Sequence, residues 1–190
     1  MRIGLLGGSF DPPHIGHLLA AGDVYDALAL DRVVFIPAAV QPLKAGQAGA
    51  AGNQRLMMVE RLIDGDPRFE ASAVEIERGG LSFTVDTLTI LAARWPSAQL
   101  FWLVGADVLR SFAKWKEPDR IVELATVVVM ERAGESTDLS AMPGQPCHVP
   151  TRRIDISSTE IRQRVREGKS IRGFVPDAVA EYIAAERLYQ

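Results

Sequence analysis

Residues 2–18 read RIGLLGGSFDPPHIGHL, an apolar run that passes through paired glycines and prolines into two of the chain's three histidines. The run from Arg2 to Leu6 predicts a buried strand, and a helix is expected to follow from His17. In a parallel sheet, ligands bind at the carboxyl ends of the strands, and the turn after the first strand is the usual place for phosphates. The stretch therefore predicts an anion site on an α/β fold.

The rest of the chain alternates short apolar runs with longer segments of helical period, which is typical of parallel strands joined by crossover helices. The expected strands are Arg2–Leu6, Val33–Ile36, Glu70–Ile76, Leu100–Val104 and Thr126–Met130. The expected helices are His17–Leu28, Gln54–Ile63, Thr84–Trp95, Pro118–Leu124, Ser158–Arg166 and Asp177–Leu188, and two segments, Ala45–Asn53 and Ala133–Pro146, are expected to be loops. We predict a doubly wound parallel sheet of about five strands in one domain, 1–190, with residues 155–190 as a small helical C-terminal subdomain.

Composition narrows the function classes. The chain has 190 residues, of which 47% are hydrophobic, and its formal net charge of -3 argues against a general binder of nucleic acid or anionic membranes. No apolar run approaches the roughly 18 residues of a membrane span. Cys147 is the single cysteine, so no internal disulfide is expected, and MRIGLLGG is too short and glycine-broken for a signal peptide. We expect a cytoplasmic protein, and the sequence leaves open whether it forms a homo-oligomer.

His14 and His17 lie three residues apart and would share one face of a helix. The first turn of that helix offers unpaired N–H groups and the positive end of its dipole, while Gly7 and Gly8 let the backbone approach a ligand. A structural alternative is that the histidines only cap or pack the helix. A transition-metal site would want a third ligand nearby, and GLLGGSF lacks the G-x-G-x-x-G spacing of a dinucleotide-binding turn.

A second group of polar residues occurs in IDISSTEIRQRV, residues 154–165. Ser157, three residues before a glutamate, predicts an ordinary capping box at a helix start. The same helix start presents the hydroxyls of Ser158 and Thr159, with Arg162 one turn along, as a second phosphate cradle would require.

Together, GSFDPPHIGHL and ISSTEIR resemble the signatures of the nucleotidyltransferases that carry an H-x-G-H motif, and the Pro-Pro-His form is similar to the nicotinate-nucleotide adenylyltransferase family. The resemblance implies a Rossmann-like nucleotidyltransferase fold. It also implies adenylyl transfer from ATP to nicotinate mononucleotide, which gives nicotinate adenine dinucleotide and pyrophosphate in NAD biosynthesis. HIGH also occurs in class I aminoacyl-tRNA synthetases, but the chain leaves no room for an anticodon-binding domain and shows no K-M-S-K-S-like loop.

In such a reaction an ionised phosphate oxygen attacks the α-phosphorus of ATP, so charge control is required rather than a general base. We expect His14, His17, Lys44 and Arg162 to be the catalytic groups, with Mg²⁺ carried by ATP and no dedicated protein metal site. Lys44 follows the second expected strand. The family usually has a histidine before this basic residue, whereas this chain has Leu43.

The resemblance further implies where the two nucleotides bind. The residues expected to bind ATP are Gly7, Gly8, Ser9, Phe10, Gly105, Asp107, Ser158 and Thr159, with the G-x-D of LVGAD at the adenosine end. SFTVDTL and FAKWKEPDRI resemble acceptor segments of the family, so Phe83 and Trp115 would stack on the pyridine ring and backbone near Thr84 would receive its carboxylate. A helix start at Thr84 and a core position for Trp115 are the structural alternatives.

Three other functions stay open. Nicotinamide mononucleotide stays open as the acceptor, because the preference for the acid over the amide follows from the family resemblance and not from residue spacing. Pantetheine-phosphate adenylyltransferases share the first motif but typically have threonine in place of the first histidine, which is His14 here. A nucleotide-binding regulator without turnover would keep the fold, although His17 and Arg162 are both present.

Overall fold

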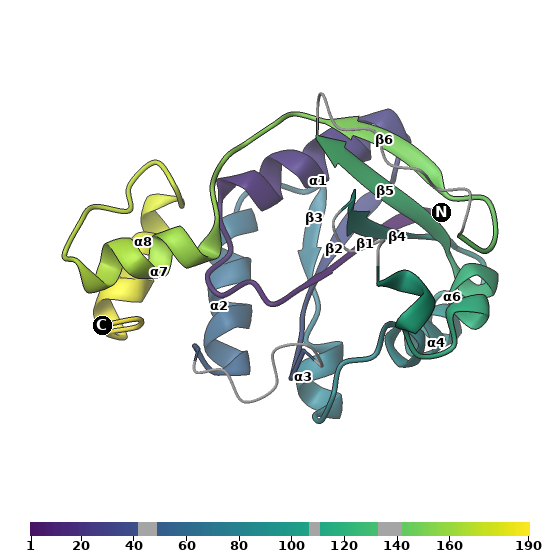
Figure 1. Cartoon of the computed structure of the whole chain (residues 1–190), viewed down its shortest axis with the longest axis horizontal. Helices are drawn as coiled ribbons and strands as arrows, with labels where there is room; N and C mark the ends of the chain where they lie inside the picture. The colour runs from purple at the N-terminus through teal and green to yellow at the C-terminus, as the bar shows by residue number, and fades with distance from the viewer. Residues whose placement is uncertain (42–48, 107–110, 133–141) are drawn as a thin grey trace.

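The computed structural model describes residues 1–41, 49–106, 111–132 and 142–190, which contain a sheet of six parallel strands in the order β3-β2-β1-β4-β5-β6 (Figure 1). The strands are β1 Arg2–Gly8, β2 Arg32–Pro37, β3 Phe69–Ala71, β4 Gln99–Gly105, β5 Thr126–Arg132 and β6 Cys147–Thr151. Because β1 lies near the centre and the order runs outward from it in both directions, the predicted doubly wound α/β fold is confirmed.

Helices cover both faces of this sheet. They are α1 Ile15–Ala27, α2 Gly52–Ile63, α3 Val74–Arg78, α4 Thr84–Arg94, α6 Pro118–Leu124, α7 Ser158–Arg166 and α8 Asp177–Ala185, with a 3₁₀ turn, η2, at Phe112–Lys114. The starts of two helices follow directly from the sequence. Pro118 occupies the first position of α6, where its missing N–H is not needed, and the Ser157 hydroxyl accepts the N–H of Glu160 at the start of α7.

Alternate residues of each strand belong to two apolar cores. Leu5 of β1 lies between Val34 of β2 and Trp102 of β4, and these three pack with α4 and α6 on one face. Leu6 faces the opposite way, into a core that also contains α1, α2, α7 and α8. The C-terminal helices α7 and α8 lie beside α2 at one end of the molecule (Figure 1). The division into a C-terminal subdomain stays a prediction.

Two features differ from the sequence prediction. The sheet has six strands rather than five. The sequence did not predict β6, because it is a short edge strand in which only Val149 and Thr151 are buried, which gives a weak apolar pattern. The strand expected over Glu70–Ile76 ends at Ala71. The Ser72 hydroxyl there accepts the N–H of Val74 at 3.4 Å, and the chain turns into α3, which the sequence analysis did not predict.

The two expected loops lie partly outside the described residues, at 45–48 and 133–141, and α2 already begins at Gly52, within the first of them. In the part of the chain that the structure describes, no helix is both long and apolar enough to span a membrane.

Candidate active site

A pocket of about 840 Å³ opens at the carboxyl ends of the strands, within the range of small-molecule sites. Five strands contribute to its lining at or just beyond their ends: Ser9 follows β1, Ala38 follows β2, and Gly105, Met130 and Thr151 belong to β4, β5 and β6. His14 and His17 lie on its floor at the start of α1, and Ser157 to Thr159 at the start of α7 complete its wall. This is the edge of the sheet that the sequence predicted.

The two histidines form a hydrogen-bonded pair. The backbone N–H of His14 donates to Nδ1 of His17 at 3.2 Å, and the rings are 3.8 Å apart between centroids. The rings of Phe10 and His17 pack in a T-shaped arrangement with their centroids 5.1 Å apart. Since Nδ1 of His17 accepts a hydrogen bond, the hydrogen of the neutral ring is assigned to Nε2. His17 thus offers one N–H donor beside the N-terminus of α1.

Burial, with a smaller contribution from nearby His14, lowers the pKa of His17 from 6.5 to about 3. The imidazole is therefore neutral at neutral pH. It can stabilise a phosphate oxygen by donating a hydrogen bond, whereas the positive potential must come from the helix dipoles and from arginine or lysine side chains.

The start of α7 is bonded directly to the loop that precedes α1. The Ser158 hydroxyl donates to the carbonyl of Pro12 at 2.8 Å, and Nη1 of Arg162 donates to the carbonyl of Asp11 at 2.7 Å. These bonds join residues 146 and 151 positions apart in the chain, and both helix N-termini face the same pocket. The site is therefore built to receive an extended anion.

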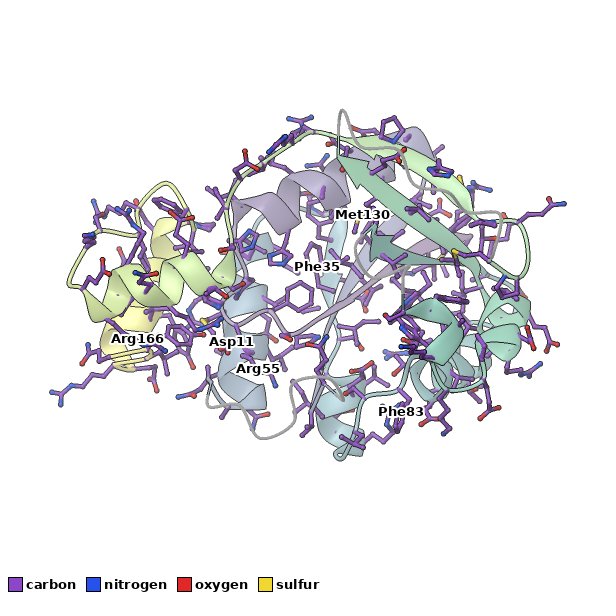
Figure 2. All side chains as sticks on the ribbon, viewed as in Figure 1. Asp11, Phe35, Arg55, Phe83, Met130 and Arg166 are labelled. Carbon is purple, nitrogen blue, oxygen red and sulfur yellow. The ribbon has the colours of Figure 1, made fainter. Side chains whose placement is uncertain are left out.

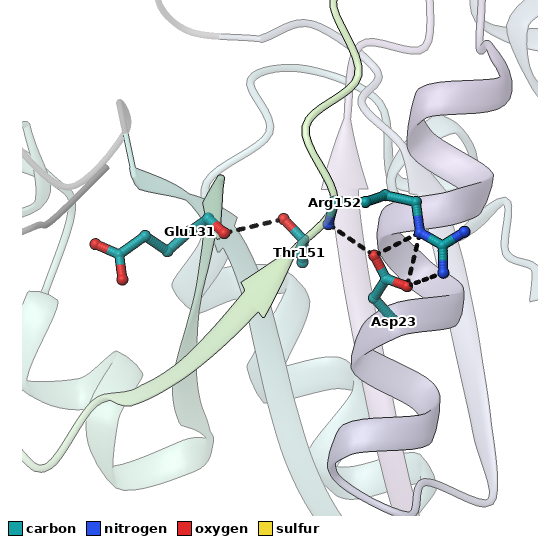
Figure 3. A network of polar contacts seen from close by, with 4 residues as sticks. All are labelled: Asp23, Glu131, Thr151 and Arg152. Carbon is teal, nitrogen blue, oxygen red and sulfur yellow. Dashed lines mark hydrogen bonds and ion pairs between the residues drawn. The ribbon is translucent and has the colours of Figure 1, made fainter. Parts of the chain in front are cut away.

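The far wall of the pocket is tied to α1 through a polar network (Figure 3). The Thr151 hydroxyl donates to the carbonyl of Glu131 at 3.3 Å, which fixes the end of β6 against β5. The next residue, Arg152, donates to Asp23 of α1 from its backbone N–H at 2.9 Å and from Nη2 at 2.7 Å. This bidentate pairing gives the wall a defined position relative to the histidines on the same helix.

Comparisons with known proteins agree with this geometry. A family model described as cytidylyltransferase-like matches residues 5–164. A protein of Gemmatimonas aurantiaca, named "Probable nicotinate-nucleotide adenylyltransferase", is 50% identical over 100% of this chain and 93% of its own length, and one of Thermus thermophilus with the same name is 45% identical over 100% of both chains. The chain belongs to the nicotinate-nucleotide adenylyltransferase family.

Solved structures support the fold. The Plasmodium falciparum nicotinic acid mononucleotide adenylyltransferase complexed with NaAD has a TM-score of 0.80 at 17% identity, covering 99% of this chain and 97% of that one. At this identity the likeness shows the fold alone, while the curated relatives carry the adenylyltransferase assignment.

The structure brings together about half of the residues expected in an adenylyltransferase site. The pocket is lined by Ser9, His14, His17, Gly105, Ser158, Thr159 and Arg162. Lys44 and Asp107 lie outside the described residues. Gly7, Gly8, Phe10, Phe83, Thr84 and Trp115 are not part of the lining.

The glycines before the motif have a packing role in this structure. A Cβ at Gly7 would lie 2.8 Å from the indole of Trp102, and one at Gly8 would lie 3.1 Å from the ring of Phe10. Gly7 therefore makes room for a buried tryptophan, and its approach to a ligand stays a prediction.

The acceptor residues lie on the other face of the sheet, and Figure 2 shows Phe83 well away from Asp11. Phe83 precedes α4 and packs, like Trp115, against the core on that side. Nε1 of Trp115 donates to the Ser111 hydroxyl at 3.3 Å. Their predicted contact with the pyridine ring stays a prediction.

Arg55 and Asp11 are among the pocket residues that the sequence did not predict. Arg55 is only 7% exposed and lies on the apolar face of α2 with Met58 and Leu62, and an arginine at a core-facing helical position was the available signal. Asp11 lies in the loop between β1 and α1. Its carboxylate accepts a hydrogen bond from the hydroxyl of Tyr189, a contact that no local pattern indicates.

Proposed function

We propose that this chain transfers the adenylyl group of ATP to nicotinate mononucleotide, releasing pyrophosphate and forming nicotinate adenine dinucleotide. The single observation that carries the proposal is the pair of bonds from Ser158 to Pro12 and from Arg162 to Asp11, which aim the N-termini of α1 and α7 at one pocket. The reaction follows from the family, and the relatives named above share it over the full length of the chain.

The proposed chemistry needs donors rather than a base. An oxygen of the acceptor phosphate bonds to the α-phosphorus of ATP as the bond from this phosphorus to the α,β-bridging oxygen breaks, and pyrophosphate leaves with the electron pair of that bond. Nε2–H of His17 donates to the transferring phosphate, while Arg162 and the N–H groups of Ser158 and Thr159 stabilise the leaving pyrophosphate. The Ser158 hydroxyl hydrogen is already given to Pro12, so that side chain positions the loop. Lys44 and His14 complete the proposed catalytic set.

The sheet order suggests how two nucleotides share the pocket. The ends of β4, β5 and β6 lie on one side of β1, and the end of β2 lies on the other. The family motif implies that the adenosine lies beside Gly105. The triphosphate then reaches His17 at the centre of the pocket, and the acceptor nucleotide occupies the part of the pocket beside Ala38. The neighbours from Plasmodium falciparum, described as complexed with NaAD and with APC, are consistent with small-molecule substrates.

We further propose that Mg²⁺ arrives with ATP, held by phosphates and water. Turnover is then abolished by EDTA and restored by added Mg²⁺. A cytoplasmic location remains a prediction from the sequence, which leaves the oligomeric state open.

Pyrophosphate release tests the function. The purified chain is incubated with ATP and, in parallel, with nicotinate mononucleotide, nicotinamide mononucleotide or pantetheine phosphate. Release with nicotinate mononucleotide, and at a clearly lower rate with the amide, is the expected result. Loss of one charge-assisted bond on the order of 1.5–3 kcal/mol corresponds to roughly 10- to 100-fold. Nucleotide binding without release would instead support the regulator.

A further inference from the structure

The segment Ala38–Gln41, here called the β2 wall, follows β2 and lines the side of the pocket opposite β4 to β6. It is fixed on both edges by backbone bonds. The N–H of Ala38 donates to the carbonyl of Gly8 at 2.9 Å, and the N–H of Ser82 donates to the carbonyl of Val40 at 2.9 Å. The Ser82 hydroxyl also accepts the N–H of Ala39 at 2.9 Å.

Arg55 of α2 supports the same wall from behind. Nη2 donates to the carbonyls of Ala38 at 2.6 Å and Ala39 at 3.1 Å. Nη1 donates to the carbonyl of Ser9 at 2.7 Å, and Nε donates to the carbonyl of Ala50 at 3.1 Å. One guanidinium thus joins four carbonyls from three segments, and every one of these residues lines the pocket.

The chemistry of the guanidinium explains why this position holds arginine. Its donors form a planar fork that reaches all four carbonyls, whereas the ammonium of a lysine is a compact point with three donors. Burial lowers the pKa of Arg55, and the nearby carboxylate of Asp11 counteracts this effect. Burying the guanidinium of Arg55 costs desolvation free energy, and its hydrogen bonds go to backbone carbonyls that shape the pocket.

We propose that Arg55 is a positioning residue that holds the β2 wall in the shape required by the acceptor nucleotide. The inference rests on the proposed function for the identity of the acceptor, nicotinate mononucleotide. Since ATP is placed beside β4 to β6, a loosened β2 wall weakens acceptor binding and leaves ATP binding largely intact. A residue needed only for folding would not separate the two substrates.

The test compares Arg55→Lys with Arg61→Lys, a matched control on the same helix whose guanidinium donates to the carbonyl of Met57, stacks on Tyr182 of α8 and is not part of the pocket lining. Steady-state kinetics give KM for each substrate, and calorimetry gives the Kd of nicotinate mononucleotide alone. For Arg55→Lys, the acceptor KM and Kd are expected to rise about tenfold or more, with the ATP KM changed by less than about threefold. Arg61→Lys is expected to match the wild type.

Ser82→Ala provides a second variant in case Arg55→Lys does not fold, because it loosens Ala39 without touching the arginine. The same selective rise, about threefold, is expected. Unchanged acceptor KM and Kd in a folded variant, or equal weakening of both substrates, overturns the inference. A wild-type chain that binds nicotinate mononucleotide without turnover refutes the proposed reaction while the Kd comparison still decides the role of Arg55. A wild-type chain that does not bind this nucleotide refutes both.

Discussion

The backbone N–H of His14 donates to Nδ1 of His17 at 3.2 Å, so the two histidines of the H-x-G-H motif have different structural roles. His14 supplies the bond that orients the second ring and leaves the Nε2 hydrogen of His17 for a ligand. The imidazole of His17 is therefore a neutral hydrogen-bond donor with a fixed direction, and it lies beside the positive end of the α1 dipole.

Replacing His17 by alanine removes that donor from the transferring phosphate. By analogy with lost oxyanion-hole donors, about 2.7–4 kcal/mol of transition-state stabilisation should disappear, so kcat is expected to fall at least ~100-fold. His148→Ala is the matched control, because this third histidine lies on β6, exposed and outside the pocket lining. Near-normal turnover by a folded His17→Ala protein would refute the assignment.

The lowered pKa of His17 also predicts an acid-dependent stability. In the unfolded chain this imidazole binds a proton below about 6.5, whereas the folded protein resists it until about 3. As pH falls through this window, the free energy of unfolding decreases by up to about 1.4 kcal/mol per pH unit from this group alone. Denaturant titrations of wild type and His17→Asn between pH 7 and 4 check it. The stability difference should shift in favour of the variant as pH falls, and parallel curves would contradict the neutral imidazole.

Arg162→Ala is expected to lower kcat by about 100-fold, because the leaving pyrophosphate loses a charge-assisted donor and the carbonyl of Asp11 loses its partner. Arg166→Ala serves as the control. Figure 2 shows Arg166 at the outer end of the same helix, away from Asp11, and the pocket lining does not include it. Equal kinetics for the two variants would show that the start of α7 does not act on the phosphates.

Gly7→Ala is expected to destabilise the protein by about 1–3 kcal/mol, since the new methyl group meets the rigid indole of Trp102 at 2.8 Å. Thermal or denaturant unfolding measures the loss. Combining the change with Trp102→Phe, which shortens the ring, should recover part of the stability. If Gly7→Ala is as stable as wild type but binds ATP poorly, the glycine serves the ligand after all.

Much of the fold could be predicted because its signals are local. The apolar runs of β1 and β4 and the serine cap at Ser157 each depend on a few neighbouring residues. Errors arose where the decisive contact is distant. Besides the local turn at Ser72, the buried Glu75 accepts a hydrogen bond from the Thr87 hydroxyl at 2.6 Å, and this contact helps to hold α3 where an apolar pattern predicted a strand.

The site shows the same division. The histidine pair and the start of α7 could be predicted from residue spacing. The four hydrogen bonds of Arg55 could not, because they go to carbonyls of three segments that meet only in the folded chain. The carboxylate of Asp11 likewise accepts from Tyr189, at the opposite end of the sequence. Such contacts follow from topology rather than from periodicity.

A crystal structure with Mg²⁺ and a non-hydrolysable ATP analogue tests most directly whether both helix beginnings serve one ligand. The account predicts a single triphosphate whose oxygens lie within hydrogen-bond distance of Nε2 of His17 and also of the Ser158–Arg162 turn. Phosphates that contact only one of these helix starts, or that lie outside the pocket, would contradict it.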